Sequence, residues 1–412
     1  MTRPRPYDVL LYGATGFVGA QTVAYFAEHA GGLRWALGGR DAARLEAVRA
    51  QAGPGAAQAG IVVADAQDAR ALRTLARKTR VVLSTAGPFA LHGSTLVAAC
   101  VEQRTHYVDI TGETPWVRGL IDRHHTEAAA GGTRIIPGCG FDSVPSDLGA
   151  WLVAQALWQA HGEPCTSVKA VFSLRGGLNG GTFASMMQVL DSGQQDLVAD
   201  PFLLNPPGTA PDDVQPHADP HAPHRDADFD AWLGPFFMGP INTRVVRRSV
   251  ALMAAPSPFA ADFHYQEYLR FGRGPVAALA AAGFSIGAVA GQQAMGFGVV
   301  RRLAQAVAPA PGQGPSQATM DGGSFRCELL GRSAGGHEQR GCIAGQGDPG
   351  NRATTRFVCE AALALALQAD ALPGGSGRGG VLTPASGLGE VLARRLQAAG
   401  MTVAPLPAGR NN

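Results

Sequence analysis

The sequence feature that most constrains the fold is a short apolar run followed by three regularly spaced glycines, within residues 7–19. The run predicts a β-strand, and Gly13, Gly16 and Gly19 give the spacing G-x-x-G-x-x-G before an amphipathic stretch. We interpret this order as strand, tight turn and helix, in which N–H groups at the helix N-terminus can bind a pyrophosphate. The alternative is a glycine turn without a ligand, but the position after the first strand favours a dinucleotide-binding domain. The expected contacts are Gly13, Ala14, Thr15, Gly16, Phe17, Val18 and Gly19.

The end of the second expected strand, at residues 33–40, indicates which dinucleotide is bound. An acid that would bind the ribose 2′-hydroxyl of NAD is missing from positions 36–39. Instead, Arg40 follows Gly39, and its guanidinium can pair with a 2′-phosphate. Asp41 is interpreted as the N-cap of the next helix. We therefore expect NADP(H) rather than NAD(H), the alternative being that Arg40 is an ordinary surface arginine.

The following segments continue an alternation of strands and helices, which predicts an α/β fold with a parallel, doubly wound sheet of the Rossmann type. Asp65, at the end of the third expected strand, is expected beside the adenine. The loop Ala86, Gly87, Pro88, Phe89 is expected near the ribose and nicotinamide end. The expected strands are 61–65, 81–89 with its Gly-Pro turn, 105–113 and 133–137, and the expected helices are 42–50, 69–78, 94–102 and 114–130.

Composition narrows the function classes. With 412 residues the chain can form two domains, and 46% hydrophobic with 16% charged residues indicates a folded globular protein. A net charge of +2 without basic clusters argues against nucleic-acid binding. The six cysteines form no C-x-x-C pair, and no signal peptide precedes the first strand. Both observations predict a reducing, cytoplasmic location. Cys139 is interpreted as a small buried residue. His217, His221 and His224 lie among prolines, so we expect no metal site.

Several motifs together resemble one family: Tyr-Gly-Ala-Thr-Gly-Phe-Val-Gly (12–19), Gly-Gly-Arg (38–40), Ala-Gly-Pro-Phe (86–89), Tyr-Val-Asp-Ile-Thr-Gly-Glu (107–113) and Gly-Cys-Gly-Phe-Asp-Ser-Val-Pro-Ser-Asp (138–147). They resemble the saccharopine dehydrogenase-like oxidoreductases, most of all the branch with the mycobacterial trans-acting enoyl reductases, which act on lipids built by polyketide synthases. Residues 180–185, 347–350 and 382–385 extend the resemblance over nearly the whole chain. It implies a Rossmann domain, a second α+β domain with a mixed sheet, and a C-terminal return to the first domain. We place these parts at 1–140, 141–350 and 351–412.

The second half of the chain has fewer distinctive patterns. A glycine-rich loop at 176–182 is interpreted either as a flexible turn or as backbone close to the substrate or nicotinamide, and residues 201–230 predict a long surface loop or lid. Residues 274–300 carry no charge, and a helix of this length could cross a bilayer core of about 30 Å. Six glycines and a Gln pair weaken that reading, so we expect a buried helical hairpin or a peripheral membrane contact. The other expected elements are helices 141–156, 183–190 and 352–369, strands 167–174, 324–330 and 340–344, and a linker at 309–323.

The reaction chemistry is expected to be hydride transfer by the nicotinamide, with the protein supplying or removing a proton. None of the six tyrosines precedes a lysine by four residues, which excludes the usual short-chain dehydrogenase mechanism. The candidate proton donors are Tyr107, Asp109, His92 and Glu113, with Tyr107 preferred; Tyr107 and Asp109 would share one strand face. The alternative is that Tyr107, Asp109 and Glu113 hold the loop in place.

Three functions follow from these observations. The first is an NADP(H)-dependent oxidoreductase, an enoyl reductase acting on a small apolar or acyl substrate of lipid or polyketide type, with a homodimer as a candidate assembly. The second is a saccharopine-type amino-acid dehydrogenase, which needs a cluster such as Arg175, Arg244, Arg247 and Arg248. The third is a non-catalytic NADP(H)-binding protein. The apolar residues near the arginines favour the first; they are Met186, Met187, Phe236, Phe237 and Met238.

Overall fold

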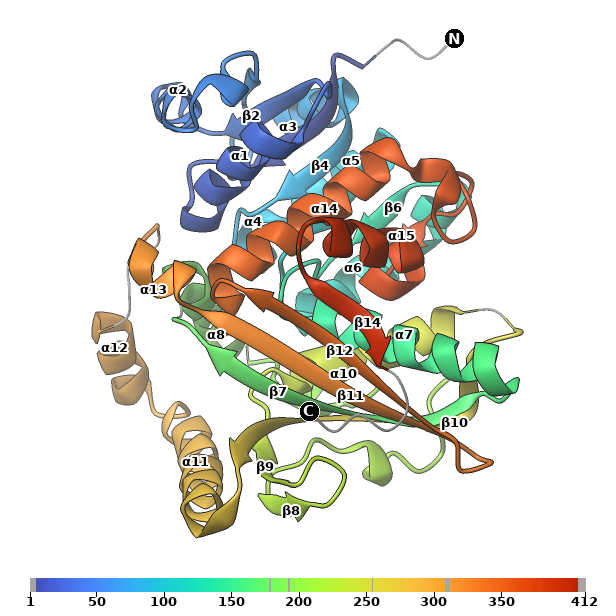
Figure 1. Cartoon of the computed structure of the whole chain (residues 1–412). Coiled ribbons are helices and arrows are strands. Elements are labelled where there is room, and N and C mark those ends of the chain that lie inside the picture. Colours follow the sequence, from blue (N-terminus) through green and yellow to red (C-terminus); the bar gives the residue numbers. More distant parts are fainter. Residues whose placement is uncertain (1–4, 178, 192, 254, 308–311, 407–412) are drawn as a thin grey trace.

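Two β-sheets, each covered by helices, form the part of the chain that the structure describes (Figure 1). The computed structural model describes residues 5–177, 179–191, 193–253, 255–307 and 312–406. The first sheet lies in the upper half of Figure 1 and is built mainly from the N-terminal part of the chain, and the second sheet lies below it.

The first sheet has seven parallel strands within the described residues. They are β1 (Tyr7–Tyr12), β2 (Trp35–Gly39), β3 (Gly60–Val63), β4 (Thr79–Ser84), β5 (His106–Asp109), β6 (Arg134–Ile136) and β13 (Gly380–Val381). Their order is β13-β6-β5-β4-β1-β2-β3, so β1 lies between β2 and β4 and the direction of sheet growth reverses there. Open parallel sheets bind ligands at the carboxyl ends of the strands at this reversal. The expected doubly wound α/β sheet is confirmed.

Helices cover both faces of this sheet. They are α1 (Phe17–His29), α2 (Ala42–Gln51), α3 (Ala69–Lys78), α4 (Phe89–His92), α5 (Ser94–Glu102) and α6 (Thr114–Ala130), with a short 3-10 helix η1 (Pro54–Ala56). Val9 and Leu11 of β1 belong to the core shared with α1, whereas Leu10 belongs to the core shared with α3 and α5. Because both faces are covered, strand side chains of either orientation must be apolar, which explains the continuous apolar runs in the sequence.

The second sheet is mixed. Its strands are β7 (Cys165–Arg175), β8 (His224–Asp226), β9 (Ala231–Pro235), β10 (Phe259–Gly272), β11 (Ser324–Ser333), β12 (Glu338–Gln346) and β14 (Thr402–Leu406). Their order is β14-β12-β11-β7-β10-β9-β8, with β7 and β10 parallel and the other pairs antiparallel. The other helices of this half are α7 (Val144–His161), α8 (Gly180–Asp191), α9 (Gln195–Ala199), α10 (Gly239–Leu252), α11 (Gly274–Ala294), α12 (Gly298–Val307) and α13 (Gln317–Asp321), with η2 (Gln215–His217).

Helix α7 packs closely on the second sheet because two glycines accept one of its side chains. A Cβ on Gly331 of β11 would lie 2.4 Å from Val153, and a Cβ on Gly341 of β12 would lie 2.6 Å from it. Both distances are shorter than real contacts, so the strands need glycine here. Val153 therefore fills a depression that two neighbouring strands share.

The chain after residue 350 contributes to both sheets. Its elements are η3 (Pro349–Ala353), α14 (Thr354–Leu367), η4 (Ala369–Ala371), β13, α15 (Pro384–Ala398) and β14. Helix α14 packs on α1 and β4, and β13 extends the first sheet beside β6, whereas β14 pairs with β12 of the second sheet. Figure 1 shows α14 and α15 lying between the two sheets, so this segment joins the two halves.

The expectation of a buried hairpin at residues 274–300 is wrong. Only 17% of the most apolar 18-residue stretch of α11 is buried, because one face of the helix packs on β9 and the rest is exposed. Its length and mean hydropathy of 1.6 would allow a membrane span, but a helix buried in a protein core can have the same composition. Only the solvent exposure, which the sequence does not reveal, distinguishes these cases.

The buried side chain of Arg134 is expected to contribute measurably to the stability of the fold. Its side chain is 1% exposed, and its guanidinium donates to the carbonyls of Gly387, Pro373 and Gly375, which holds the start of α15 and the segment before it against β6. Arg134→Met should lower the free energy of unfolding by about 2–4 kcal/mol, because three carbonyls lose their donor. Urea denaturation measures this change, with Arg394→Met as the control, since Arg394 is exposed and, among the described residues, binds Glu390 alone. Equal losses in both variants would contradict the assignment.

Candidate dinucleotide-binding and active site

The turn after β1 is shaped by contacts that leave no room for side chains. Gly13 has a φ of +83°, and a Cβ on it would lie 2.8 Å from the backbone nitrogen of Ala86. A Cβ on Gly19 would lie 2.1 Å from the carbonyl oxygen of Gly13. The turn, the start of α1 and the end of β4 are thus packed backbone against backbone, as a dinucleotide-binding turn requires.

The N-terminus of α1 is available to an anion. Gly16 is the N-cap residue, and no side chain caps the first turn. Thr15 and Phe17 are partly exposed, whereas Ala14, Val18 and Gly19 are buried. Unpaired N–H groups and the positive end of the helix dipole favour a pyrophosphate at this position. The residues present therefore fit the phosphates of a dinucleotide.

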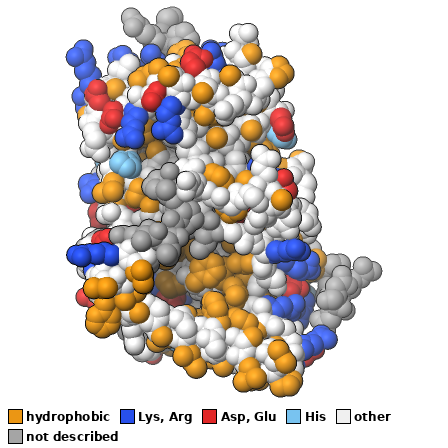
Figure 2. Space-filling model, turned by 90° about the vertical axis from the view of Figure 1, so that its left-hand side faces the viewer, with side chains coloured by type: hydrophobic (Ala, Val, Ile, Leu, Met, Phe, Trp, Pro, Cys, Tyr) orange, Lys and Arg blue, Asp and Glu red, His pale blue; other side chains and the backbone are white. Residues whose placement is uncertain are grey.

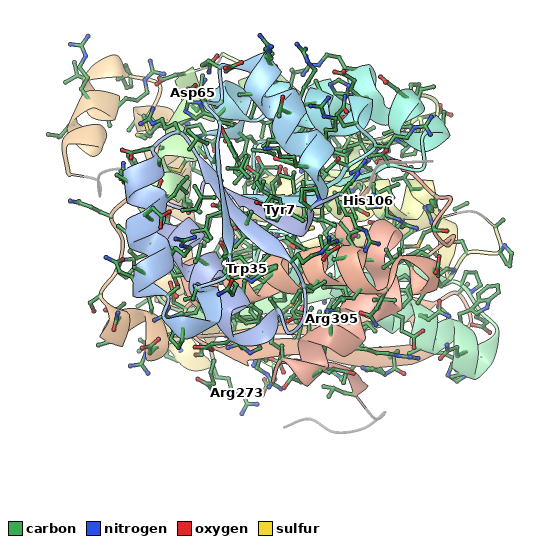
Figure 3. All side chains as sticks on the ribbon, turned by 90° about the horizontal axis from the view of Figure 1, so that it is seen from above. Tyr7, Trp35, Asp65, His106, Arg273 and Arg395 are labelled. Carbon is green, nitrogen blue, oxygen red and sulfur yellow. The ribbon has the colours of Figure 1, made fainter. Side chains whose placement is uncertain are left out.

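The expected ribose and adenine residues gather at the carboxyl ends of β1, β2 and β3. The Tyr12 hydroxyl donates to the carbonyl of Ala64 at 3.2 Å. Burial raises the pKa of Tyr12 to about 12; the charge of Asp65 adds to the rise and that of Arg40 opposes it, so both charges lie near this hydroxyl. Figure 3 shows Asp65 at the opposite end of the strands from Trp35, which begins β2.

Arg40 is free to bind a ligand. It is exposed at the end of β2, and in the described part of the chain it makes no hydrogen bond or ion pair. Gly39 before it is buried, and Asp41 after it accepts a hydrogen bond from the backbone N–H of Arg44 at 3.1 Å. Asp41 is thus the predicted helix cap, with its Oδ1 bonded to the backbone of α2. The geometry suits a 2′-phosphate better than a free ribose.

The loop after β4 is fixed by a buried carboxylate. Glu113 accepts hydrogen bonds from the backbone N–H groups of Phe89 and Ala90, both at 2.8 Å. Its Oε1 also accepts from the Ser185 hydroxyl of α8 at 2.7 Å. Ser185 lies against Gly87 as well, where a Cβ would be 3.5 Å from its oxygen. Glu113 therefore joins the expected nicotinamide loop, including Pro88, to the second half of the chain. This agrees with the alternative that Glu113 holds the loop in place and does not donate a proton.

The glycine-rich loop before α8 is also held in place. Asn179 donates to Asn351 at 2.7 Å and accepts from the backbone N–H of Thr182 at 3.0 Å. A Cβ on Gly177 would lie 2.7 Å from Pro315, and a Cβ on Gly314 would lie 2.4 Å from the ring of Phe17. These contacts favour backbone positioned near the dinucleotide turn over a flexible turn.

Tyr107 and Asp109 share one face of β5, as expected, but both are fully buried. Asp109 accepts hydrogen bonds from the backbone N–H groups of Thr111 and Gly138, at 3.0 and 2.9 Å, so it fixes the loops after β5 and β6. Burial raises the pKa of Asp109 to about 7 and the pKa of Tyr107 well above its ordinary value. In this conformation neither side chain reaches solvent, which favours the structural alternative for both. His92 lies half-buried at the end of α4, and its role stays a prediction.

Asp142 is the carboxylate at this edge that our sequence analysis missed. It follows β6 and is partly exposed, and within the described residues it makes no hydrogen bond or ion pair. A Cβ on Gly112 would lie 3.7 Å from its Oδ2 and 3.1 Å from Ile241 of α10. Burial raises the pKa of Asp142 to about 6. The signal was its place in the motif of residues 138–147, which we used only for the family resemblance.

A small cavity lies between the same elements. Its volume of about 20 Å³ is enough for one water molecule. It includes residues from the loops after β5 and β6, from α6 and from α10. The lining residues are Thr111, Gly112, Thr114, Val117, Pro137, Gly138, Leu204, Ile241, Val245, Arg248, Leu382 and Thr383. The cavity therefore marks where the carboxyl edge of the first sheet meets α10.

The arginines of α10 are occupied by the protein itself. Arg244 binds Asp219 at 2.6 Å and the carbonyls of residues 198–200. Arg247 donates to the carbonyls of Pro201, His217 and Tyr265. Arg248 donates to Val381 and Leu204. These buried guanidinium groups fasten the segment 198–219 to the fold.

The other expected apolar lining residues separate into two groups. Phe236, Met238 and Met187 are buried, and Phe236 stacks on Phe172 with ring centroids 4.4 Å apart. Met186 of α8 and Phe237 are about half exposed. Of the five, Met186 and Phe237 remain accessible to a ligand.

Cys139 is fully buried, which confirms its interpretation as a small buried residue.

Comparison with known proteins supports the dinucleotide site. Residues 9–136 match the saccharopine dehydrogenase NADP-binding domain. The chain is 38% identical over 416 residues to a trans-acting enoyl reductase of Mycobacterium ulcerans (strain Agy99), with 97% of each chain covered. It is 37% identical over 418 residues to one of Mycobacterium tuberculosis (strain H37Rv), with the same coverage. The fold is similar to apo saccharopine dehydrogenase (L-Glu forming) of Saccharomyces cerevisiae, with a TM-score of 0.50 and 13% identity over 97% of this chain and 99% of that chain. The prediction of NADP(H) is thereby confirmed.

The position of Arg40 predicts cofactor selectivity. Arg40→Ala should raise the Kd for NADPH about tenfold or more, because hydrogen bonds between charged groups contribute about 1.5–3 kcal/mol. The Kd for NADH should change less than about twofold, since NADH lacks the 2′-phosphate. Titration calorimetry measures both, and Arg44→Ala, an exposed arginine of α2, is the control. An NADPH affinity that stays within about twofold of the parent would remove the role of Arg40.

Proposed function

We propose that this chain, which belongs to the saccharopine dehydrogenase-like oxidoreductases and within them to the trans-acting enoyl reductases, reduces the conjugated double bond of a lipid- or polyketide-type acyl substrate. Its NADP-binding domain makes it an NADP-dependent oxidoreductase. The observation that carries the substrate class is the state of the α10 arginines, which are buried and bonded within the fold.

A substrate with several carboxylates needs free cationic groups. Of the four arginines expected from the sequence, Arg244, Arg247 and Arg248 are each 3% exposed or less and donate to carbonyls or Asp219. Arg175 at the end of β7 is exposed, so one cationic group of the four remains accessible for several carboxylates. Releasing one of them would leave buried acceptors without a donor, which costs about 1–3 kcal/mol for each group. The saccharopine-type activity is therefore disfavoured, whereas the exposed Met186 and Phe237 suit an apolar acyl chain.

Enoyl reduction requires one hydride and one proton. When bound, NADPH supplies the hydride for the β-carbon of the enoyl group. The α-carbon then takes a proton, and Asp142 is the carboxyl group that we assign to this transfer, because it is partly exposed where β6 meets α10. Its raised pKa keeps part of the population protonated near neutral pH. Glu113 and Ser185 hold the loop at Phe89 in position beside this edge.

The activity is tested by mixing the protein with NADPH and a panel of substrates. The panel contains short- and long-chain trans-2-enoyl thioesters, and 2-oxo acids paired with amino acids. We expect loss of the reduced-nicotinamide absorbance with the enoyl thioesters, faster with the longer chains, and formation of the saturated thioester by mass spectrometry. Turnover with the amino-acid pairs alone would establish the second function instead, and NADPH binding without any turnover would favour the non-catalytic one.

The role assigned to Asp142 predicts that kcat depends on pH. If the protonated carboxyl donates the proton, kcat should be highest below the pKa of about 6 and should fall as the pH rises through that value. Asp142→Asn should lower kcat by about 100-fold or more and remove this fall, with the Kd for NADPH unchanged. Asp212→Asn, at an exposed position in the loop before β8, is the control. An Asp142→Asn protein with full turnover and the parental pH profile would refute the assignment.

A further inference from the structure

Helices α11 and α12 present a continuous apolar surface to solvent. On α11, Val276, Leu279 and Ile286 are 78%, 75% and 70% exposed, and on α12 Val299 is 78% exposed. Phe297 in the turn between the helices is 69% exposed. Single exposed apolar residues need no explanation, but such a concentration marks an interaction surface.

The shape of this surface limits what can cover it. Ala277, Ala281 and Ser285 attach one face of the first half of α11 to the protein, next to β9. Beyond that point every residue from 286 to 293 is exposed, and the loop at residues 221–223 faces this part of α11 only across an open hollow. Figure 1 shows α11 and α12 at the left-hand margin of the molecule, with α11 beside β9. A flat protein partner would cover only one side of this part of α11, whereas a fluid lipid layer can surround it.

The charges around the surface are mainly positive. Residues 274–300 contain no charged side chain, and arginines stand at both ends. At one end Arg225 and Arg273 share a single partner, Asp230, which leaves one positive charge in excess. At the other end Arg302 is exposed and has no ion pair within the described residues. Arginines at the edge of an apolar surface complement anionic headgroups.

The neighbourhood of α11 also has space for an acyl chain. An open hollow of about 520 Å³ lies between the second half of α11 and the loop at residues 221–223. Its lining is mostly apolar: Ala222, Pro223, Ala282, Ile286, Val289 and Ala290, with His221, Ser285 and Gln293. Figure 2 faces the side of the molecule that carries α11 and α12, and it shows hydrophobic side chains gathered over the lower part of that side, with Lys and Arg side chains at the margins.

We propose that α11 and α12 form a peripheral docking surface for a lipid layer with anionic headgroups. The exposed apolar side chains would enter the interfacial region, and the flanking arginines would lie at headgroup level. A full span is disfavoured because Ala277 and Ala281 would have to leave their packing beside β9. This inference goes beyond the proposed function, since lipid docking does not depend on which substrate is reduced.

The test is flotation of the purified full-length chain with vesicles. Vesicles of phosphatidylcholine containing phosphatidylglycerol should bind the protein, and vesicles of phosphatidylcholine alone should bind it more weakly. The double variant Ile286→Asp, Val299→Asp should lower the partition coefficient at least about tenfold, because two apolar side chains lose their burial in the layer. The control is Leu367→Asp at the end of α14, which is 53% exposed but lies outside this surface. Turnover of a short soluble substrate should not change in the double variant, which separates docking from activity.

Two results would overturn the proposal. The first is binding of the double variant to anionic vesicles with the affinity of the parent. The second is failure of the parent to bind either kind of vesicle. If in addition the parent runs as a dimer in size-exclusion chromatography and the double variant as a monomer, the surface is an interface between two copies of the chain.

Discussion

The structure depends on the close approach of three backbone segments where β1, α1 and the end of β4 meet. Gly13 adopts a left-handed conformation there, and neither Gly13 nor Gly19 has room for a Cβ. This contact places the N-terminus of α1 at the reversal of strand order in the first sheet. Because the N–H groups of that first turn are uncapped, the same constraint that closes the fold also creates the phosphate site.

The second half of the chain is positioned by buried polar contacts. The hydrogen bond from Ser185 to Glu113 connects α8 to the loop after β4, and Asn179 and Asn351 fix the glycine-rich loop. The arginines of α10 fasten the segment 198–219 through its carbonyl groups. As a result the edge of the first sheet faces a surface in which polar groups are largely satisfied. Among the described residues, the groups left for chemistry at this edge are the dinucleotide site and the carboxylate of Asp142, which makes no hydrogen bond there.

The N-terminal fold could be predicted from the sequence because its signals are local. The helices at 69–78, 94–102 and 114–130 have the predicted bounds, and Asp41 caps α2 as expected. The mixed sheet was implied only by resemblance, and the sequence analysis did not predict β8, β9, β10 and α10. β8 and β9 are short strands that pair with each other, whereas β10 pairs with the distant β7 and α10 bonds to distant carbonyl groups, so local sequence patterns do not mark these elements. Helix α10, with three arginines in five residues, resembles a surface helix until its carbonyl acceptors are known.

The candidate site shows the same limit. The residues of the glycine turn could be identified because the strand, the spaced glycines and the helix follow one another within a short segment. The accessibility of Tyr107 could not be predicted, because it depends on the helices that pack on the face of β5 that carries Tyr107. Asp142 was overlooked because its importance comes from the missing hydrogen bonds and from α10, which lies about 100 positions later in the chain.

The turn at residues 13–19 and Arg40 together form the expected NADP(H) site. The most direct measurement is a crystal structure of the complex with NADP⁺. We expect pyrophosphate density against the N-terminus of α1 and the 2′-phosphate within hydrogen-bond distance of the Arg40 guanidinium. A dinucleotide bound elsewhere, or one whose 2′-phosphate points away from Arg40, would contradict it.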